Sequence, residues 1–389
     1  MDLPLIDHHC HAVARDRLDR AALESFLTES DRPPPAGCTT FDSLLGMAVR
    51  QRCAPVLDLA AGADPDDYVA RRAELGGEEA NRRLLGTAGL EALLVDTGLA
   101  GEDLLGLSEL ARLSGADAHE VVRLESVAVD LAAAGVGAAE FEGAFGEALR
   151  RRAADAVAVK SIIAYRHGLD FDPRPPSSAE VVKAAGRWLT GGRARVQDEV
   201  LLRHLLWEGL ATELPLQLHT GFGDPDEDLA RCDPALLTGF LRACADAGPP
   251  VLLLHCYPYH RHAAYLAAVM PHVYLDVGLA IPHVGRRAGA VLAETLELAP
   301  FHKLLYSSDA YGLAELYLLA TLSFRESLAE VLDGLAIVGA DRDRIAAMVG
   351  SGNARRVYRL PERSTAACTT SEAYRAEGTD LARREHERY

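Results

Sequence analysis

The cysteines of this sequence lack the spacing of a disulfide framework or of a CxxC site. There are seven, an odd number, and no two of them are separated by only two residues. This usage is typical of reduced cysteines and does not fit a small secreted fold held by disulfides. Also missing are the segments of a signal peptide and any charge-free apolar run long enough to span a bilayer. We therefore expect a cytoplasmic protein with no membrane partner.

Positive charge is scarce in this chain. Lysine and arginine together number 40, against 57 aspartates and glutamates, and the net charge is −17. Such a balance argues against nucleic acid or anionic lipid as the main partner and favours a small-molecule substrate. Apolar residues make up 49% of the chain, which is enough for a large core. A homodimer is the default assembly that we expect.

Glycine is absent from the stretch DHHCHAV, residues 7–13, which follows the first apolar run. An open doubly wound sheet would more often carry a glycine-rich phosphate loop here. Eight short apolar runs, alternating with helical patterns in the later part of the chain, predict parallel strands buried on both faces. The predicted strands are 3–7, 90–98, 121–129, 156–165, 214–221, 251–258, 272–278 and 303–312. Eight such units predict an α/β fold, the closed (β/α)8 TIM barrel.

The predicted barrel occupies residues 1–361. A long gap separates the first two predicted strands and contains further helical patterns. We interpret about residues 15–88 as a helical insertion that caps the barrel mouth. The chain then becomes polar and charged, and residues 362–389 are predicted to form a C-terminal tail.

Polar side chains gather where the predicted strands end. They are Asp7, His9 and His11 after the first strand, and Lys160, His219, His255 and Asp309 on the fourth, fifth, sixth and eighth. In a barrel these strand ends meet at one mouth, where active sites of this fold are built. The grouping therefore predicts a functional site.

The two-residue period of a strand separates the first histidines. His9 and His11 share one face, and we expect both to point into the mouth. His8 lies on the other face and is expected to point toward the helices. Asp7 shares the face of His9 but lies deeper, so we expect it to orient the site. Two imidazoles at this spacing suit a divalent metal.

These residues together resemble the amidohydrolase superfamily of metal-dependent hydrolases. The stretches KSIIAYRHGL, PLQLHTGFGD, LLLHCYP, YSSDAYG and GSGNARRVY are similar to its amidohydrolase-2 branch. They also resemble the amidohydrolase-like half that is fused to glutamine synthetase in nodulin-like proteins. The resemblance covers residues 3 to about 360. It supports the barrel fold but says little about the substrate.

The resemblance implies a role for each of the strand-end residues. The implied metal ligands are His9, His11, Lys160, His219, His255 and Asp309. His9 and His11 would bind a first, more buried ion, and His219 and His255 a second. Asp309 would contact the first ion and act as the general base toward the attacking water. Lys160 and His255 complete the set of catalytic candidates.

The resemblance also implies that Lys160 bridges two metals as an N-carboxylated lysine. Burial and nearby cations lower the pKa of a lysine, and the neutral amine can add carbon dioxide. The alternative is an unmodified Lys160 that binds Asp309 or a substrate carboxylate beside a single metal. Zinc is the expected metal, with manganese, iron and nickel as alternatives.

Further polar residues follow the predicted strands and are candidates for substrate binding. They are Arg166, Asp224, Tyr257, Asp276 and Tyr311. Arg166 could clamp a substrate carboxylate and Asp224 could bind an amine. Arg123 and Glu125 fall in the middle of the predicted third strand, where we expect an internal ion pair.

The sequence thus predicts an enzyme, a metal-dependent hydrolase that cleaves an amide-type C–N bond in a small carboxylated substrate. The nodulin-like resemblance points to γ-glutamyl or other amino-acid-derived amides. The alternatives are a non-oxidative decarboxylase of the same superfamily, which usually uses one metal, and an ester or lactone hydrolase. A non-catalytic barrel would need a broken ligand set, whereas every ligand position here is filled.

Overall fold

The computed structural model describes residues 3–99, 101–192, 195–245 and 248–361. By its internal contacts the chain divides into Met1–Arg359, which holds the barrel, and Leu360–Tyr389. The predicted tail, residues 362–389, lies outside the described residues. Among the described helices, none has the length and apolar character needed to cross a membrane.

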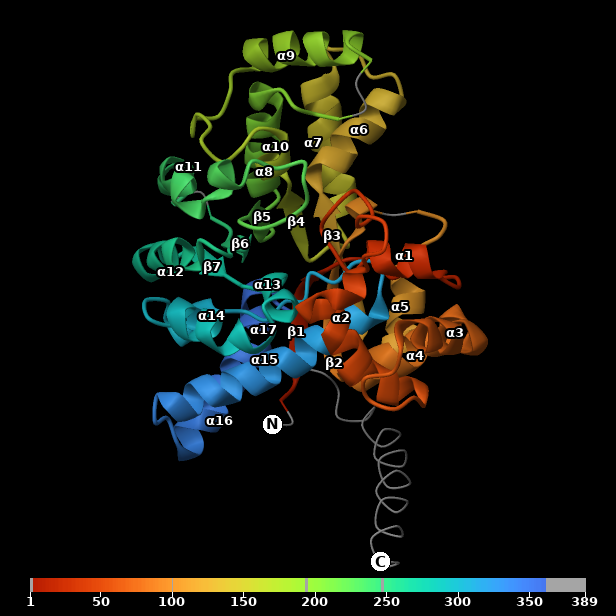
Figure 1. The fold of residues 1–389 in the computed structure, drawn as a ribbon. Coiled ribbons are helices and arrows are strands. Elements are labelled where there is room, and N and C mark those ends of the chain that lie inside the picture. Colours follow the sequence, from red (N-terminus) through yellow and green to blue (C-terminus); the bar gives the residue numbers. More distant parts are fainter. Residues whose placement is uncertain (1–2, 100, 193–194, 246–247, 362–389) are drawn as a thin grey trace, which may run out of the picture. The chain divides into compact units, whose positions relative to one another are not determined.

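The core of the first unit is one parallel sheet whose strands follow each other in chain order (Figure 1). The strands are β1 Leu5–Cys10, β2 Leu90–Asp96, β3 Asp117–Arg123, β4 Ala158–Ser161, β5 Leu216–Thr220, β6 Val251–His255 and β7 Val273–Leu275. Every residue of β1, β4, β5 and β6 is buried. This explains their nearly continuous apolar runs, because both faces of such strands are covered.

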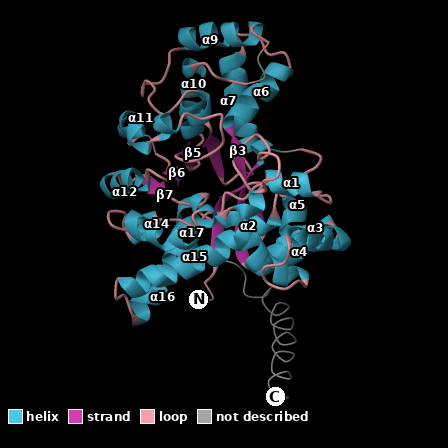
Figure 2. Cartoon of the chain, viewed as in Figure 1, coloured by secondary structure: helices cyan, strands magenta, loops and turns pink. Residues whose placement is uncertain are grey.

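Helices surround these strands, as Figure 2 shows. Their bounds are α1 Arg20–Ser25, α2 Leu44–Ala48, α3 Pro65–Leu75, α4 Gly77–Ala88, α5 Leu107–Ser114, α6 Leu124–Ala133, α7 Phe141–Ala153, α8 Ile163–Arg166, α9 Ser178–Thr190, α10 Glu199–Ala211, α11 Thr238–Ala243, α12 His260–Val269, α13 Ala280–His283, α14 Ala288–Thr295, α15 Ala314–Gly334, α16 Gly339–Ala347 and α17 Asn353–Tyr358. The alternation of strand and helix is that of a (β/α)8 barrel.

The eighth predicted strand, 303–312, is not a regular strand. Its backbone nevertheless joins both edges of the sheet, since Leu305 N–H donates to Leu275 O at 3.0 Å and His8 N–H donates to Tyr306 O at 3.1 Å. The ladder to β1 is interrupted at Ser308, whose backbone N–H donates to Asp7 Oδ1 at 2.9 Å instead of to a backbone carbonyl. This closing segment takes the place of the eighth strand between β7 and β1.

The third strand begins four residues and ends six residues earlier than predicted. It covers Asp117–Arg123, and α6 begins at Leu124. The apolar residues after Arg123 are spaced for a helix, because α6 buries Leu124, Val127 and Ala128 on one side. A continuous apolar run does not distinguish such a helix from a strand.

The predicted insertion contains α1 to α4, between β1 and β2. A buried ion pair connects it to α15, with Arg72 Nε 2.8 Å from Glu315 Oε1. The Tyr68 hydroxyl donates to the same carboxylate oxygen at 2.9 Å. Breaking one partner of such a buried pair costs about 3–5 kcal/mol, so this contact holds α3 in one place.

Candidate metal centre

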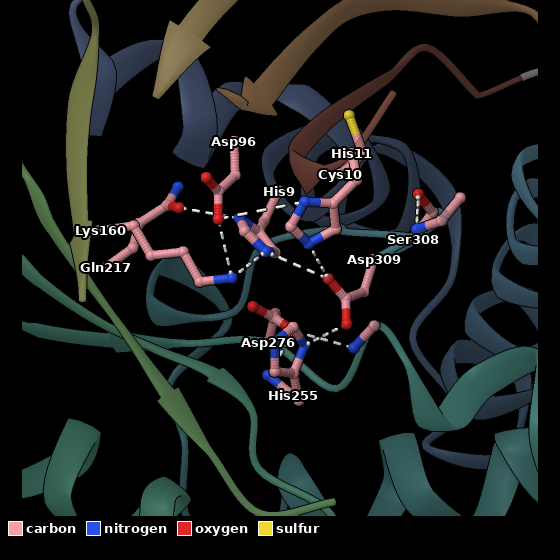
Figure 3. A network of polar contacts seen from close by, with 12 residues as sticks. His9, Cys10, His11, Asp96, Lys160, Gln217, His255, Asp276, Ser308 and Asp309 are labelled. Carbon is pink, nitrogen blue, oxygen red and sulfur yellow. Dashed lines mark hydrogen bonds and ion pairs between the residues drawn. The ribbon is translucent and has the colours of Figure 1, made fainter. Parts of the chain in front are cut away.

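Side chains from three strands and the closing segment converge at the carboxyl ends of the strands (Figure 3). His9 Nε2 lies 2.9 Å from Lys160 Nζ and 3.1 Å from Asp309 Oδ1. His11 Nε2 lies 3.2 Å from the same Asp309 oxygen, and His255 Nδ1 lies 3.5 Å from Asp309 Oδ2. The structure therefore brings together five of the six residues that the sequence predicts as ligands.

Gln217 of β5 sets the orientation of the His9 ring. Its amide nitrogen donates to His8 O and to the Tyr358 hydroxyl, both at 2.8 Å. Its Oε1 is thereby left to accept from His9 Nδ1, at 2.9 Å. With the proton on Nδ1, the lone pair of His9 Nε2 faces Lys160 and Asp309. Burial and the charge of Lys160 lower the pKa of His9 to about 4, which keeps the ring neutral and able to bind a cation.

Asp309 lies at the centre of the cluster. Burial alone would raise its pKa, but His255, His11 and His9 hold the pKa of this carboxyl well below its usual range. Its backbone N–H donates to His9 O at 3.0 Å. Asp7 accepts from the backbone and the hydroxyl of Ser308, so it positions the residue next to Asp309. This is the orienting role expected for Asp7.

Asp96, at the end of β2, is a site residue that was not predicted from the sequence. Its Oδ2 lies 3.2 Å from Lys160 Nζ and 2.6 Å from Arg123 Nη2. Burial opposes ionisation of Asp96, but Arg123 and Lys160 hold its pKa well below the usual range. The pKa of Lys160 is lowered by its own burial, against the attraction of Asp96. The signal that could have identified Asp96 is its position directly after the apolar run LEALLV.

His255 has an unusual backbone that Asp276 stabilises. Its φ is 66°, a left-handed value that a residue with a Cβ rarely adopts. The Oδ1 of Asp276 accepts from His255 N–H at 2.9 Å and from Gly278 N–H at 2.8 Å. Strained residues of this kind cluster at functional sites.

Asp276 is not placed to bind substrate, and this prediction was wrong. The side chain is fully buried, and its other oxygen lies 3.0 Å from His8 Nε2. Both carboxylate oxygens of Asp276 therefore form their hydrogen bonds within the protein. The Nδ1 of His8 lies 2.8 Å from the Tyr358 hydroxyl of α17, so His8 is directed away from the metal-ligand candidates, as the strand period predicts.

His219 lies beside His255 but pairs with a carboxylate other than Asp309. Its ring is 4.8 Å from that of His255, but its Nε2 lies 3.0 Å from Glu227 Oε2. The ring of Tyr165 packs against His219 at a tilt, with ring centroids 4.2 Å apart. Neither Glu227 nor Tyr165 was selected from the sequence. Both lie in loops or short helices, where no strand period indicates direction.

The donor set fits a divalent cation. Both ring nitrogens of His255, Nδ1 of His11 and Oδ1 of Asp309 are buried and form no hydrogen bond among the described residues. The ligand atoms form two groups, and within each group all atoms lie within 4.8 Å of one another. One group comes from His9, His255 and Asp309, and the other from His9, His11 and Asp96. Buried polar atoms without partners are rare, and a metal ion would satisfy these.

A cavity of about 390 Å³ opens above this cluster. Of the five predicted substrate-binding residues, three line it, Arg166, Asp224 and Tyr311. Tyr257 does not line it, since its ring stacks on His260 with centroids 5.8 Å apart, so this prediction was wrong. Glu29 and Phe26 of the insertion also line the cavity. The insertion therefore contributes to the mouth.

The expected ion pair between Arg123 and Glu125 does not form. Arg123 is bonded to Asp96, with Nη2 2.6 Å from Oδ2. Glu125 accepts from the Ser161 hydroxyl at 2.6 Å and from Ile162 N–H at 3.0 Å. The two side chains separate because β3 ends at Arg123 and Glu125 already belongs to α6.

Comparisons with solved structures support the barrel. The structure is similar to a protein from Lactobacillus casei that is assigned as a metal-dependent hydrolase, with a TM-score of 0.83 and 31% identity over 92% of this chain and 96% of that one. A uronate isomerase from Bacillus halodurans shares the fold, with a TM-score of 0.64 and 14% identity over 95% and 96% of the two chains.

Comparisons of sequence identify the family. The chain is 34% identical over 233 residues to the protein FluG of Emericella nidulans, which is 55% of this chain and 27% of that protein. The chain thus spans well under two thirds of that relative. The family model for amidohydrolases matches residues 6–360, nearly all of the described chain. The chain belongs to the amidohydrolase family.

Proposed function

We propose that the protein is a metal-dependent hydrolase that cleaves an amide-type C–N bond in a small carboxylated substrate. The observation that carries this proposal is the set of buried ligand atoms around Asp309, several of which form no hydrogen bond among the described residues. His9, His11, His255 and Asp309 would hold a divalent cation. When bound, such a cation lowers the pKa of water and stabilises the charge that develops on a carbonyl oxygen.

Asp309 is the proposed general base. Its low pKa keeps it ionised, and it faces the cavity with 11% of its side chain exposed. It accepts a proton from the water that attacks the carbonyl carbon. It then returns that proton to the leaving nitrogen as the C–N bond breaks. The neutral ring of His9 and the carboxylate of Asp96 keep their positions through both steps.

The geometry of Lys160 is compatible with carboxylation. Its Nζ points into the cluster, toward His9, and its lowered pKa favours the neutral amine that adds carbon dioxide. We propose that carboxylated Lys160 would hold a second cation together with His219 and His255, with zinc as the expected metal. His219 would first have to release Glu227. The unmodified lysine paired with Asp96 is the one-metal alternative.

The cavity also supports a substrate carboxylate. Arg166 Nη1 lies 3.4 Å from Asp226 Oδ2, and Arg195 contacts the same oxygen. Both guanidinium groups line the cavity, where they could bind a substrate carboxylate in place of Asp226. Arginine is well suited to bind it.

The test is Asp309→Asn on metal-loaded protein, with a panel of amides of small dicarboxylic and amino acids. We expect turnover to fall by about 10²–10⁴-fold. Asp341→Asn, an exposed carboxylate paired with Arg344, is the control and should leave turnover unchanged. Released amine shows C–N hydrolysis, whereas released carbon dioxide would show a decarboxylase instead. Undiminished turnover in Asp309→Asn with metal retained would contradict the assignment of the base.

A further inference from the structure

The cavity above the cluster has walls of opposite charge. Arg123 of β3, Lys160 of β4 and Arg166 of α8 line it. Glu29 of the insertion and Asp224, after β5, line it as well. Thr28, Glu29, Asp224 and His283 also line an adjoining cavity of about 550 Å³, so these four residues form the partition between the two cavities.

Among the described residues, Glu29 forms no ion pair with an arginine or a lysine. Its nearest cationic candidate in the described chain is His283, whose Nε2 lies 3.9 Å from Oε1. Partial burial, together with the charges of Asp309, Asp224 and Glu227, raises the pKa of Glu29 to about 7. Burial and neighbouring acids also raise the pKa of Asp224. Crowded carboxylates of this kind favour the arrival of a positive charge.

His283 adds an independent sign of a missing donor. Its Nδ1 lies 2.9 Å from Leu279 O, a carbonyl that can only accept, so Nδ1 carries the proton. The Nε2 atom is then an acceptor, and it is buried without a hydrogen bond among the described residues. Burial lowers the pKa of His283, which keeps the ring neutral. The partition thus presents three acceptors, one from each of Glu29, Asp224 and His283.

We infer that Glu29, Asp224 and His283 bind an ammonium group of the substrate, which is therefore a zwitterionic amino-acid amide. An ammonium group has three N–H donors, one for each acceptor. The substrate carboxylate lies toward Arg166, and the amide carbon lies over Asp309. This inference rests on the proposed function for the amide group of the substrate. The ammonium site itself can be tested by ligand binding, without any turnover.

The test compares ligands that differ only in the ammonium group. The pairs are aspartate and succinate, glutamate and glutarate, and aminoadipate and adipate. Affinities are measured by calorimetry on the full chain, with and without added zinc. In at least one pair we expect the amino acid to bind about tenfold more tightly, equivalent to about 1.4 kcal/mol. Glu29→Gln should remove this preference and leave the affinity of the plain diacid unchanged or higher.

Glu297→Gln is the matched control, because Glu297 is exposed and paired with Arg261 on the outside of the barrel. It should keep the preference for the amino acid. Asp224→Asn provides a second variant in case Glu29→Gln fails to fold. Equal binding of both members in all three pairs, or an unchanged preference in both folded variants, would overturn the inference. Binding with the preference but no amide hydrolysis would instead contradict the proposed function alone.

Discussion

At the scale of single residues, the cluster depends on side chains that never touch the cavity. Gln217 fixes the tautomer of His9, and Asp276 holds the backbone of His255. Neither role can be predicted from the sequence, because each depends on a contact between residues on different strands. His9, His255 and Asp309 could be predicted, since each lies near the end of a predicted strand and a strand end has a predictable place in a barrel.

Replacing Gln217 by methionine should weaken metal binding without removing a ligand. The proton on His9 Nδ1 would lose its acceptor, and such outer partners are worth about 10–100-fold in metal affinity. Zinc affinity is measured by competition with a chromophoric chelator. Gln51→Met, at an exposed position, is the control. An unchanged zinc affinity in folded Gln217→Met would show that His9 does not need this partner.

Glu29 makes the binding of an ammonium ligand dependent on pH. The groups that face it are Asp309, Asp224, Glu227 and His283. Because its pKa is raised to about 7, Glu29 is charged above that pH and neutral below it. The preference for an amino acid over the plain diacid should therefore decline as the pH falls through 7, and calorimetry at several pH values checks this. In Glu29→Gln the preference should no longer depend on pH. A preference in the wild type that does not change with pH would contradict the raised pKa of Glu29.

At the scale of elements, the barrel strands were predictable and the loops that complete the site were not. Continuous apolar runs identify strands buried on both faces, but they also misplaced β3, because α6 starts with an equally apolar stretch. The closing segment was predicted as a strand, yet its ladder is interrupted where Ser308 N–H donates to the side chain of Asp7. Glu227 and Tyr165 were missed because loop direction depends on contacts rather than on periodicity.

Gly223 illustrates such a contact in the loop after β5. A Cβ at this position would lie 2.0 Å from the Tyr165 hydroxyl and 3.0 Å from His219 Cε1. Gly223→Ala should therefore destabilise the protein by about 1–3 kcal/mol, the usual range for overpacking. Adding Tyr165→Phe should recover part of the loss, because the closest atom is then gone.

Urea denaturation measures these free energies of unfolding. Gly143→Ala is the control, since Gly143 lies in α7 with open space around it. Alanine there should be neutral or stabilising by up to about 1 kcal/mol. If Gly223→Ala is as stable as Gly143→Ala, the loop does not pack on Tyr165 as described.

At the scale of the whole molecule, the fold and the cation are expected to be coupled. The ligand candidates come from β1, β4, β6 and the closing segment, so a bound cation would connect both ends of the sheet. Ligand binding to the native state stabilises it, by about 4 kcal/mol when the free ligand is about 1,000 times its Kd. Removing the metal with a chelator should lower the Tm, and adding zinc should restore it.

The metal content of purified protein tests the central claim most directly. After dialysis against zinc and removal of excess, elemental analysis should find at least one zinc per chain in the wild type and in His262→Asn, whose exposed histidine pairs with Asp233. The variant His9→Asn with His11→Asn should retain none while keeping its helical circular dichroism. A wild type without bound metal, or equal zinc in the folded double variant, would contradict a metal centre at the strand ends.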